Sequence, residues 1–390
     1  MLRRGEIYFA SAAELNDASE CRPHFIFKGS RELWQRLAGF VLEHVCFCSG
    51  YFQRGYDDQI PKVLDLSEPV GSQLKKDARN RDLGLKGLSS AFSKALKMIG
   101  AEKLQPPLLN AVEHLAVSFI EQGLPRVLQD RKYIASFALN ATNPTMWGHY
   151  AEAEKGFVRV FQTEDGKLGV HSELAILHGT RPSKIGDGVT EVGIYKDELL
   201  DLKHVQYGKR IPKVNAFHRL IPRFSYTEEE DHYDVPLMIG GDAEEKKEHL
   251  IGLTKYSDWR YEKEVRAFFP AFESFPSDAR ALRLSTRNIK GLVFGPKMSE
   301  ENKVRAVICS HIMHETYQSE NNAGHEFVFF QAQQAVESFN FLIHPVGILG
   351  GHYFGRSLPL TKLSDLDEAT VARLHALADE IKVSGRASSR

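Results

Sequence analysis

The sequence has few cysteines and no sign of a disulfide framework. Cys21, Cys46, Cys48 and Cys309 are the four among 390 residues, whereas small disulfide-dependent domains carry many more. Cys46 and Cys48 lie in an apolar run and lack a second Cys or His pair at metal-ligand spacing. We therefore expect buried structural thiols, no metal site, and a chain suited to a reducing cytoplasm.

Net charge and long apolar runs are also missing. The formal net charge is −1, so no global basic field favours nucleic acid or an anionic membrane. No run approaches the ~20 apolar residues of a membrane span. The first residues include Arg3 and Arg4 but no apolar segment of a signal peptide. These absences predict a soluble cytoplasmic protein without a membrane partner.

Several common catalytic motifs are absent from the sequence. It contains no phosphate loop of the G-x-x-x-x-G-K-[ST] type, no G-x-G-x-x-G and no G-x-S-x-G. Kinases, P-loop enzymes, Rossmann enzymes and serine hydrolases are therefore poor fits.

The periodicity of apolar residues predicts an α+β protein with a central mixed or antiparallel sheet. Strands are expected at residues 6–11, 132–138, 157–161, 189–195, 204–207, 291–296, 327–330 and 339–343. Helices are expected at residues 31–48 and 72–99, from residue 106 onward, near 144–150 and 299–308, and at 366–381. Residues 210–255 are expected to be largely helical, with a solvated acidic run at 228–231. We predict one domain over residues 1–350, with a helical insertion at about 31–131, then a C-terminal loop, helix and disordered tail over 351–390.

The stretch Trp259–Arg266 is the most informative part of the chain. It follows a polar turn and precedes Ala267-Phe268-Phe269, so it is predicted as a strand. Alternation would place Arg260, Glu262, Glu264 and Arg266 on one face. Two interpretations follow: a solvated ladder of ion pairs with the arginines on neighbouring strands, or the wall of a cleft that needs a carboxylate.

Four blocks, in order, carry a resemblance to a known family. They are Ile7-Tyr8-Phe9-Ala10-Ser11 with Leu15-Asn16-Asp17 and Glu20-Cys21; Ser136-Phe137-Ala138 with Met146-Trp147-Gly148-His149-Tyr150-Ala151 and Lys155-Gly156-Phe157; Lys255 and Trp259 with Tyr261-Glu262-Lys263-Glu264 and Arg266; and Phe294-Gly295-Pro296-Lys297-Met298-Ser299. The chain resembles the bacterial family called domain of unknown function 2971. The family has no established activity, so the resemblance informs the fold more than the function.

A fold-level analogy leads to the main functional hypothesis. In ADP-ribosyltransferase-like enzymes a strand carries a Glu-x-Glu pair, whose last carboxylate stabilises the positive charge that forms as nicotinamide leaves NAD. By this analogy Glu264 is the catalytic carboxylate and Glu262 its partner toward the acceptor. NAD would be the substrate, and no metal is expected. Ser136, in an earlier strand, would support the nicotinamide ring.

The remaining candidate residues would hold the nicotinamide end of the substrate. Trp147 or Tyr150 would stack on the ring, with His149 as a polar contact. Trp147 and Tyr150 also share a helix face with Met146, which core packing explains equally well. Asn16 and Asp17 follow a strand and a helical turn, and fit either a turn or a ligand contact.

Two other functional classes stay open. A non-enzymatic sensor or partner-binding protein would use the helical insertion and the C-terminal helix as its binding surface. A metal-dependent nuclease would use Glu264 and Asp258, but Arg266 stands where a general base needs a group that can lose its proton. His311 and His314 have the spacing of metal ligands on a helix. If the protein is a transferase, its acceptor is a protein or a nucleic acid that the sequence does not identify.

Overall fold

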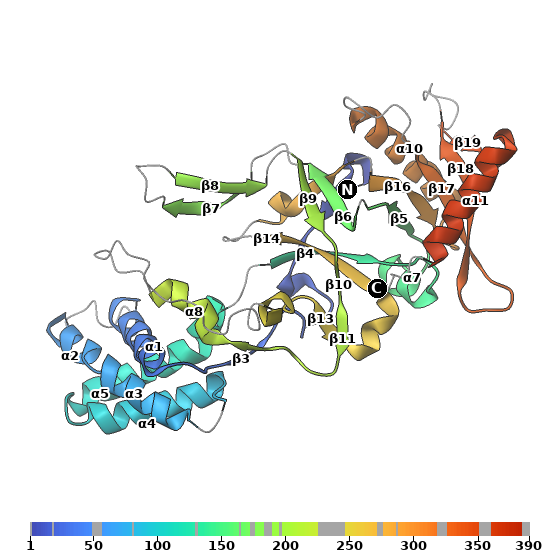
Figure 1. Cartoon of the computed structure of the whole chain (residues 1–390). Coiled ribbons are helices and arrows are strands. Elements are labelled where there is room, and N and C mark those ends of the chain that lie inside the picture. Colours follow the sequence, from blue (N-terminus) through green and yellow to red (C-terminus); the bar gives the residue numbers. More distant parts are fainter. Residues whose placement is uncertain are drawn as a thin grey trace. The chain divides into compact units, whose positions relative to one another are not determined.

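The computed structural model divides the chain into two compact units (Figure 1). Unit 1 comprises Met1–Glu20, Arg131–Lys209 and Lys255–Arg390, and unit 2 comprises Cys21–Asp130 and Arg210–Thr254. The residues described are 2–17, 19–48, 57–79, 82–128, 132–163, 165–171, 176–182, 189–194, 197–224, 246–270, 276–285, 288–317, 326–350 and 360–383.

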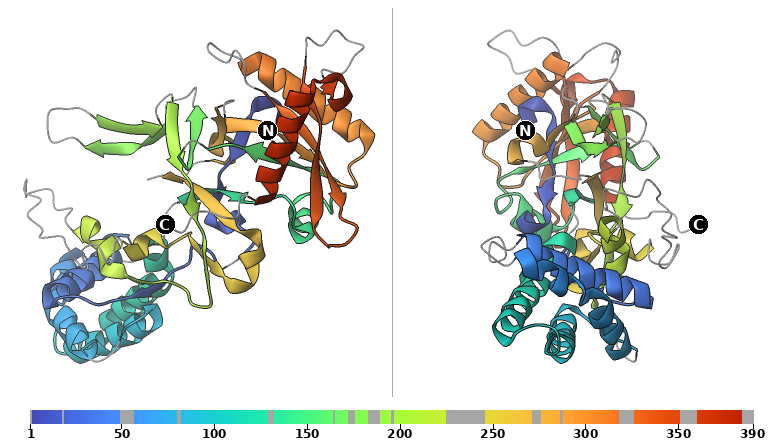
Figure 2. Two further views of the ribbon diagram at one scale, coloured as in Figure 1. Left: turned by 45° about the vertical axis from the view of Figure 1, so that its right-hand side comes forward. Right: turned by 90° about the vertical axis from the view of Figure 1, so that its left-hand side faces the viewer.

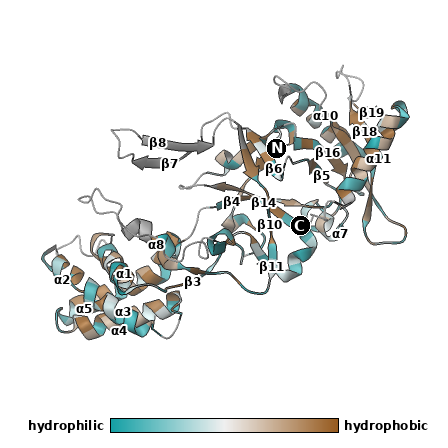
Figure 3. Cartoon of the chain, viewed as in Figure 1, coloured by the Kyte–Doolittle hydropathy of each residue, from teal (hydrophilic) through white to brown (hydrophobic). Residues whose placement is uncertain are grey.

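A five-stranded mixed sheet forms one layer of unit 1. Its order is β19 (Leu360–Lys362), β18 (Phe341–Leu349), β17 (Val328–Gln334), β16 (Ile289–Phe294) and β5 (Phe157–Phe161). Only the β16–β17 pairing is parallel. Hydrophobic residues run along β16, β17 and β18 (Figure 3). β16 is buried on both faces, whereas buried and less buried residues alternate along β18.

Two helices cover the two faces of this sheet, as the two views of Figure 2 show. α10 (Glu300–Tyr317) packs Ala306 and Val307 against the face that carries Leu292 and Phe329. α11 (Glu368–Val383) packs Leu374 and Ala378 against the face with Val293 and Phe330. Neighbouring strand residues therefore enter different cores, which follows from the two-residue period of a strand.

Two antiparallel sheets complete most of unit 1. One has the order β10 (Lys203–His204), β14 (Glu264–Pro270), β4 (Lys132–Ala138) and β2 (Ala10–Ser11). The other has the order β1 (Glu6–Tyr8), β15 (Ala281–Leu284), β6 (Lys167–His171) and β9 (Asp197–Asp201). The smaller pairs are β7 (Ile176–Pro182) with β8 (Val189–Ile194), and β11 (Gln206–Gly208) with β13 (Thr254–Tyr256).

The helix α7 (Pro144–Tyr150) lies between β4 and β5 in the chain. Asn143 caps it by accepting a hydrogen bond from the Thr145 amide at 2.9 Å, and Pro144 occupies its first turn. The short 3₁₀ helices of unit 1 are Leu2–Arg4, Ala12–Glu14, Ser257–Glu262, Ser277–Arg280 and Leu363–Asp365.

Unit 2 is a helical bundle with one short parallel strand pair. Its helices are α1 (Arg31–Glu43), α2 (Ile60–Leu64), α3 (Ser67–Asp77), α4 (Leu85–Gly100), α5 (Pro106–Ser118), α6 (Leu124–Leu128) and α8 (Ala216–Phe224). Short helical turns occupy His44–Cys48, Asp57–Gln59 and Phe119–Gly123, and β3 (His24–Ile26) pairs with β12 (Lys213–Asn215). α1 and α3 touch at Gly71, where an added Cβ would lie 2.3 Å from the Gln35 Cα. Only glycine fits that contact.

The α+β class, the mixed and antiparallel sheets and the C-terminal helix are confirmed. The division at residue 350 stays a prediction. The single helix expected over 72–99 is wrong, because α3 ends at Asp77 and α4 begins at Leu85. Leu83 instead forms a bridge with Phe27, whose amide donates to the Leu83 carbonyl at 2.9 Å, so a tertiary contact overrides the helical pattern.

Two smaller expectations need qualification. The first strand is divided into β1 and β2, which join different sheets. Cys46 is buried, whereas Cys21 and Cys309 are partly exposed and the Cys48 side chain lies outside the described residues. The acidic run at 228–231 also lies outside them.

Candidate functional site

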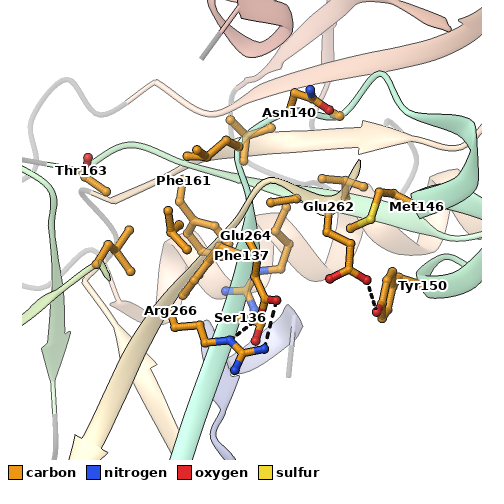
Figure 4. Close-up of a pocket in the computed structure, with 18 of the residues that line it drawn as sticks. Ser136, Phe137, Asn140, Met146, Tyr150, Phe161, Thr163, Glu262, Glu264 and Arg266 are labelled. Carbon is orange, nitrogen blue, oxygen red and sulfur yellow. Dashed lines mark hydrogen bonds and ion pairs between the residues drawn. The ribbon is translucent and has the colours of Figure 1, made fainter. Parts of the chain in front are cut away.

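A cavity of about 840 Å³ lies within unit 1 and is lined by strands of several sheets, by α7 and by α11 (Figure 4). β4 and β14 supply one wall and β5 another. The predicted site residues that line it are Asn16, Ser136, Trp147, Tyr150, Glu262 and Glu264. Its volume lies within the range of ligand pockets, about 300–1,000 Å³.

The chain enters this cavity through a 3₁₀ helix, so the predicted strand over Trp259–Arg266 is wrong in its first half. Ser257–Glu262 is helical, and the strand β14 begins only at Glu264. Lys263 sits between them in the left-handed region, with φ of 45°. The turn at Lys263 lets both Glu262 and Glu264 line the cavity.

The carboxylates belong to a buried ionic cluster, which we define as Glu20, Lys255, Glu262, Glu264 and Arg266. Each of the five is at most 5% exposed. The solvated ladder is therefore wrong, because water does not cover these charges. The ion pair expected between Glu264 and Arg266 is confirmed, but within one strand rather than between neighbouring strands.

Lys255 is the centre of the cluster. Its Nζ lies 2.5 Å from Glu262 Oε2 and 3.2 Å from both Glu264 Oε2 and Glu20 Oε1. The ammonium also lies 5.0 Å from the centre of the Trp259 ring, a cation–π distance. A single ammonium thus contacts three carboxylates from two parts of the chain.

Arg266 binds two of these carboxylates, Glu264 and Glu20, from the strand side. Its Nε donates to Glu264 Oε1 at 2.6 Å and its Nη2 to Glu264 Oε2 at 3.0 Å, a bidentate arrangement (Figure 4). Nη2 also donates to Glu20. Residues i and i+2 of a strand share a face, which is why the strand positions this pair.

The cluster is charged and unbalanced. Three carboxylates and two cations leave a formal charge of −1. Burial raises the pKa of Glu264, but the Arg266 and Lys255 charges and a hydrogen bond from Ser136 outweigh it, so this pKa lies below its ordinary value. The carboxylates likewise raise the pKa of Lys255 and Arg266 against the effect of burial. All three groups therefore stay ionised near neutral pH.

Tyr150 joins the cluster to the open part of the cavity. Its side chain is 48% exposed, and its hydroxyl donates to Glu262 Oε1 at 2.7 Å (Figure 4). Burial, and next the bond to Glu262, raise the pKa of Tyr150 to about 12, although a hydrogen bond with Asn16 lowers it. Tyr207 supports the other side, because its hydroxyl oxygen accepts from the Glu264 amide at 2.8 Å.

The structure places three predicted site residues differently. Trp147 is 1% exposed and its Nε1 donates to the Ala141 carbonyl at 2.6 Å, so the indole is mainly a core side chain that touches the cavity wall. His149 is exposed, with its ring 6.3 Å from that of Trp259. Asp17 accepts from the Ser19 amide at 2.8 Å as a turn residue, and neither Asp17 nor His149 lines the cavity.

Three residues of the cluster were not among the predicted site residues: Glu20, Lys255 and Arg266. All three belong to the family blocks, so the signal was present. Lys255 and Glu20 lie outside the strand β14, so the alternation of side chains along that strand cannot place them beside it. Only the tertiary fold brings Glu20 to Arg266.

Metal ligands are not grouped in the described part of the chain, where no three His, Cys, Asp or Glu side chains are arranged to hold an ion. His311 lies in α10, and its Nε2 is 3.1 Å from Glu315 Oε1. Asp258 is exposed on the 3₁₀ helix.

The fold and site define an α+β protein with a buried, net-negative ionic cluster in the wall of a cavity. Residues 146–267 match the model of a family described as "Protein of unknown function (DUF2971)". The predicted resemblance to this family is confirmed over that stretch, which runs from α7 into β14 and contains four of the five cluster residues. No curated protein and no solved structure matches the chain. Among the described residues, no helix has both the length and the apolar character to cross a membrane.

Proposed function

We propose that the cavity binds NAD and that the cluster stabilises the positive charge formed when the bond between nicotinamide and ribose breaks, the chemistry of an ADP-ribosyltransferase-like enzyme. One observation carries the proposal: a buried, ionised cluster with a formal charge of −1 lines a cavity of about 840 Å³. A fixed negative charge in a water-poor site favours a developing cation.

The hydrogen bonds divide the roles of the two glutamates. Glu264 accepts from Arg266 through both oxygens, from Lys255 and from Ser136, which fills the roughly four lone-pair sites of a carboxylate. Glu262 accepts only from Tyr150 and Lys255 among the described residues. Glu262 is therefore proposed as the carboxylate that contacts the ribose. Glu264 is proposed to supply a second negative charge without touching the ribose.

In the proposed step, the glycosidic bond between nicotinamide and ribose breaks, and its electron pair leaves with the nicotinamide ring. The ribose becomes an oxocarbenium-like cation beside Glu262. Water or an acceptor side chain then bonds to that carbon and gives up a proton, for which Glu262 is the proposed base. The exposed half of the Tyr150 ring is the surface proposed to stack on nicotinamide.

A second function is binding without chemistry. The complete pairing of Glu264 favours it, because a carboxylate that accepts four hydrogen bonds serves equally well to fix the wall of a ligand pocket. The same cavity would then hold its ligand as a sensor, without turnover.

The test is release of nicotinamide from NAD by the full chain, followed chromatographically with cell lysate as acceptor source. We expect Glu262→Gln to reduce release about 100-fold or more, while Glu301→Gln, on exposed α10, leaves it unchanged. No release by the wild type would reject the enzymatic proposal. NAD binding without release would support the sensor.

A further inference from the structure

Arg159 is a partly buried cation that lines the same cavity and that the proposed chemistry does not use. It lies at the centre of β5, and its neighbours Val158 and Val160 pack toward α11 in the other core. Arg159 therefore shares the face of Phe157 and Phe161. Its guanidinium carbon lies 5.1 Å from the centre of the Phe161 ring.

The guanidinium is largely without acceptors. Its Nη1 donates to the Glu6 carbonyl at 2.6 Å. Its Nε and Nη2 are buried and have no hydrogen-bond partner among the described residues, and no described carboxylate forms an ion pair with it. Burial accordingly lowers the pKa of Arg159 to about 10, so the group remains a cation at neutral pH.

Buried guanidinium donors without acceptors are costly unless something else binds them. Two other buried arginines of unit 1 donate to carboxylates, Arg266 to Glu264 and Arg280 to Glu14. Arg159 has no carboxylate partner among the described residues, and its side chain lines the cavity instead. Lys290 on β16, the strand beside β5, lines that cavity too and adds a second positive charge.

We infer that Arg159, with Lys290, is the binding site for an anionic phosphate group of the ligand, on the wall opposite in charge to the ionic cluster. The planar fork of Arg159 matches two phosphate oxygens. Its identification as the diphosphate of NAD rests on the proposed function, whereas the anion site itself does not.

The cavity would then be matched in charge to both parts of one ligand. The net-negative cluster faces the cationic nicotinamide riboside, and the Arg159 wall faces the diphosphate. A nucleotide that carries a positive charge and phosphates in one molecule fits this arrangement better than a neutral ligand does.

The test measures dissociation constants of the full chain for ADP-ribose, inorganic pyrophosphate and nicotinamide riboside. We expect Arg159→Met to weaken ADP-ribose and pyrophosphate at least ~10-fold, as for loss of a charge-assisted contact, and to leave nicotinamide riboside unchanged. Arg159→Lys should lose less, and Arg305→Gln, an exposed arginine of α10, should lose nothing.

Thermal unfolding separates this role from a structural one. Removal of an unpaired buried cation should leave the melting temperature of Arg159→Met equal to or above that of the wild type. A lower melting temperature with unchanged anion binding would mean that the guanidinium only anchors Glu6, and would overturn the inference. So would a wild type that binds neither ADP-ribose nor pyrophosphate. Pyrophosphate binding that depends on Arg159 without any nicotinamide release would uphold the anion site and reject only the proposed chemistry.

Discussion

The two units of this chain each bury charges, but in different ways. In unit 2, Arg219 and Glu248 form a balanced pair, with Nε at 2.9 and 3.0 Å from the two carboxylate oxygens. In unit 1, three carboxylates share two cations, and the excess negative charge lines a cavity. A balanced pair serves the fold alone, whereas an unbalanced cluster beside a cavity has charge left for a ligand.

The largest expected effect comes from removal of a carboxylate that the cluster needs. Glu264→Ala removes the bidentate partner of the buried Arg266, and should lower the free energy of unfolding by about 3–5 kcal/mol. Glu248→Ala, in the slightly more exposed pair, should lose less, about 1–3 kcal/mol. Urea unfolding measures both, and a larger loss for Glu248→Ala would contradict the difference drawn between the two regions.

Charge balance gives the second prediction. Glu262→Gln brings the cluster from −1 to neutral, and the amide can still accept from Lys255 and donate to the Tyr150 oxygen. We expect its stability to stay within about 1 kcal/mol of the wild type, because no buried group loses all its partners. Glu248→Gln, in the balanced pair, should lose more. If Glu262→Gln unfolds the protein instead, Glu262 is a structural residue.

Acid should weaken unit 1 through Glu264. The folded pKa of this carboxyl lies below its ordinary value of 4.5, so the unfolded chain binds more protons as the pH falls below that value. The stabilisation is complete above about 4.5 and is lost as the pH falls toward the folded pKa. Unfolding measured between pH 3 and 6 should show a smaller slope in Glu264→Gln than in the wild type. Some slope should remain, because the Arg280 hydrogen bond also lowers the pKa of Glu14. An unchanged slope would mean that Glu264 does not carry the effect.

The smallest effect concerns Tyr150. Tyr150→Phe removes the hydrogen bond to Glu262 and should cost about 0.5–1.5 kcal/mol. Tyr256→Phe is the matched control, since Tyr256 is 46% exposed and has no hydrogen bond from its hydroxyl among the described residues. Equal losses in urea unfolding for the two variants would show that the bond at the cavity contributes nothing measurable.

The sequence predicted the fold class, and six of the eight candidate site residues line the cavity. The failures have physical causes. Alternation placed Glu264 and Arg266 together correctly, because that segment is a strand. It failed over Trp259–Lys263, where a left-handed residue ends a 3₁₀ helix, a conformation that no period of two describes. Motif order drew attention to Trp147, but its burial depends on contacts with Phe341, a residue far along the chain.

The residues hardest to predict from the sequence were those whose role depends on missing hydrogen-bond acceptors or on a distant partner. Arg159 sits in a regular apolar-and-polar strand, and nothing in the sequence indicates that its guanidinium has few acceptors. Glu20 follows a turn and joins Arg266 only through the tertiary fold. Sequence periodicity indicates the face of a strand or helix on which a residue lies. It does not identify partners such as Glu20 and Arg266, which lie far apart in the chain.

The central claim is that the excess negative charge of the cluster acts on a ligand in the cavity. The most direct measurement is nicotinamide release from NAD by the wild type and by Glu262→Gln, with both shown to be folded by thermal unfolding. The account predicts release by the wild type and at least ~100-fold less by the folded variant. Equal release by the two proteins would contradict it.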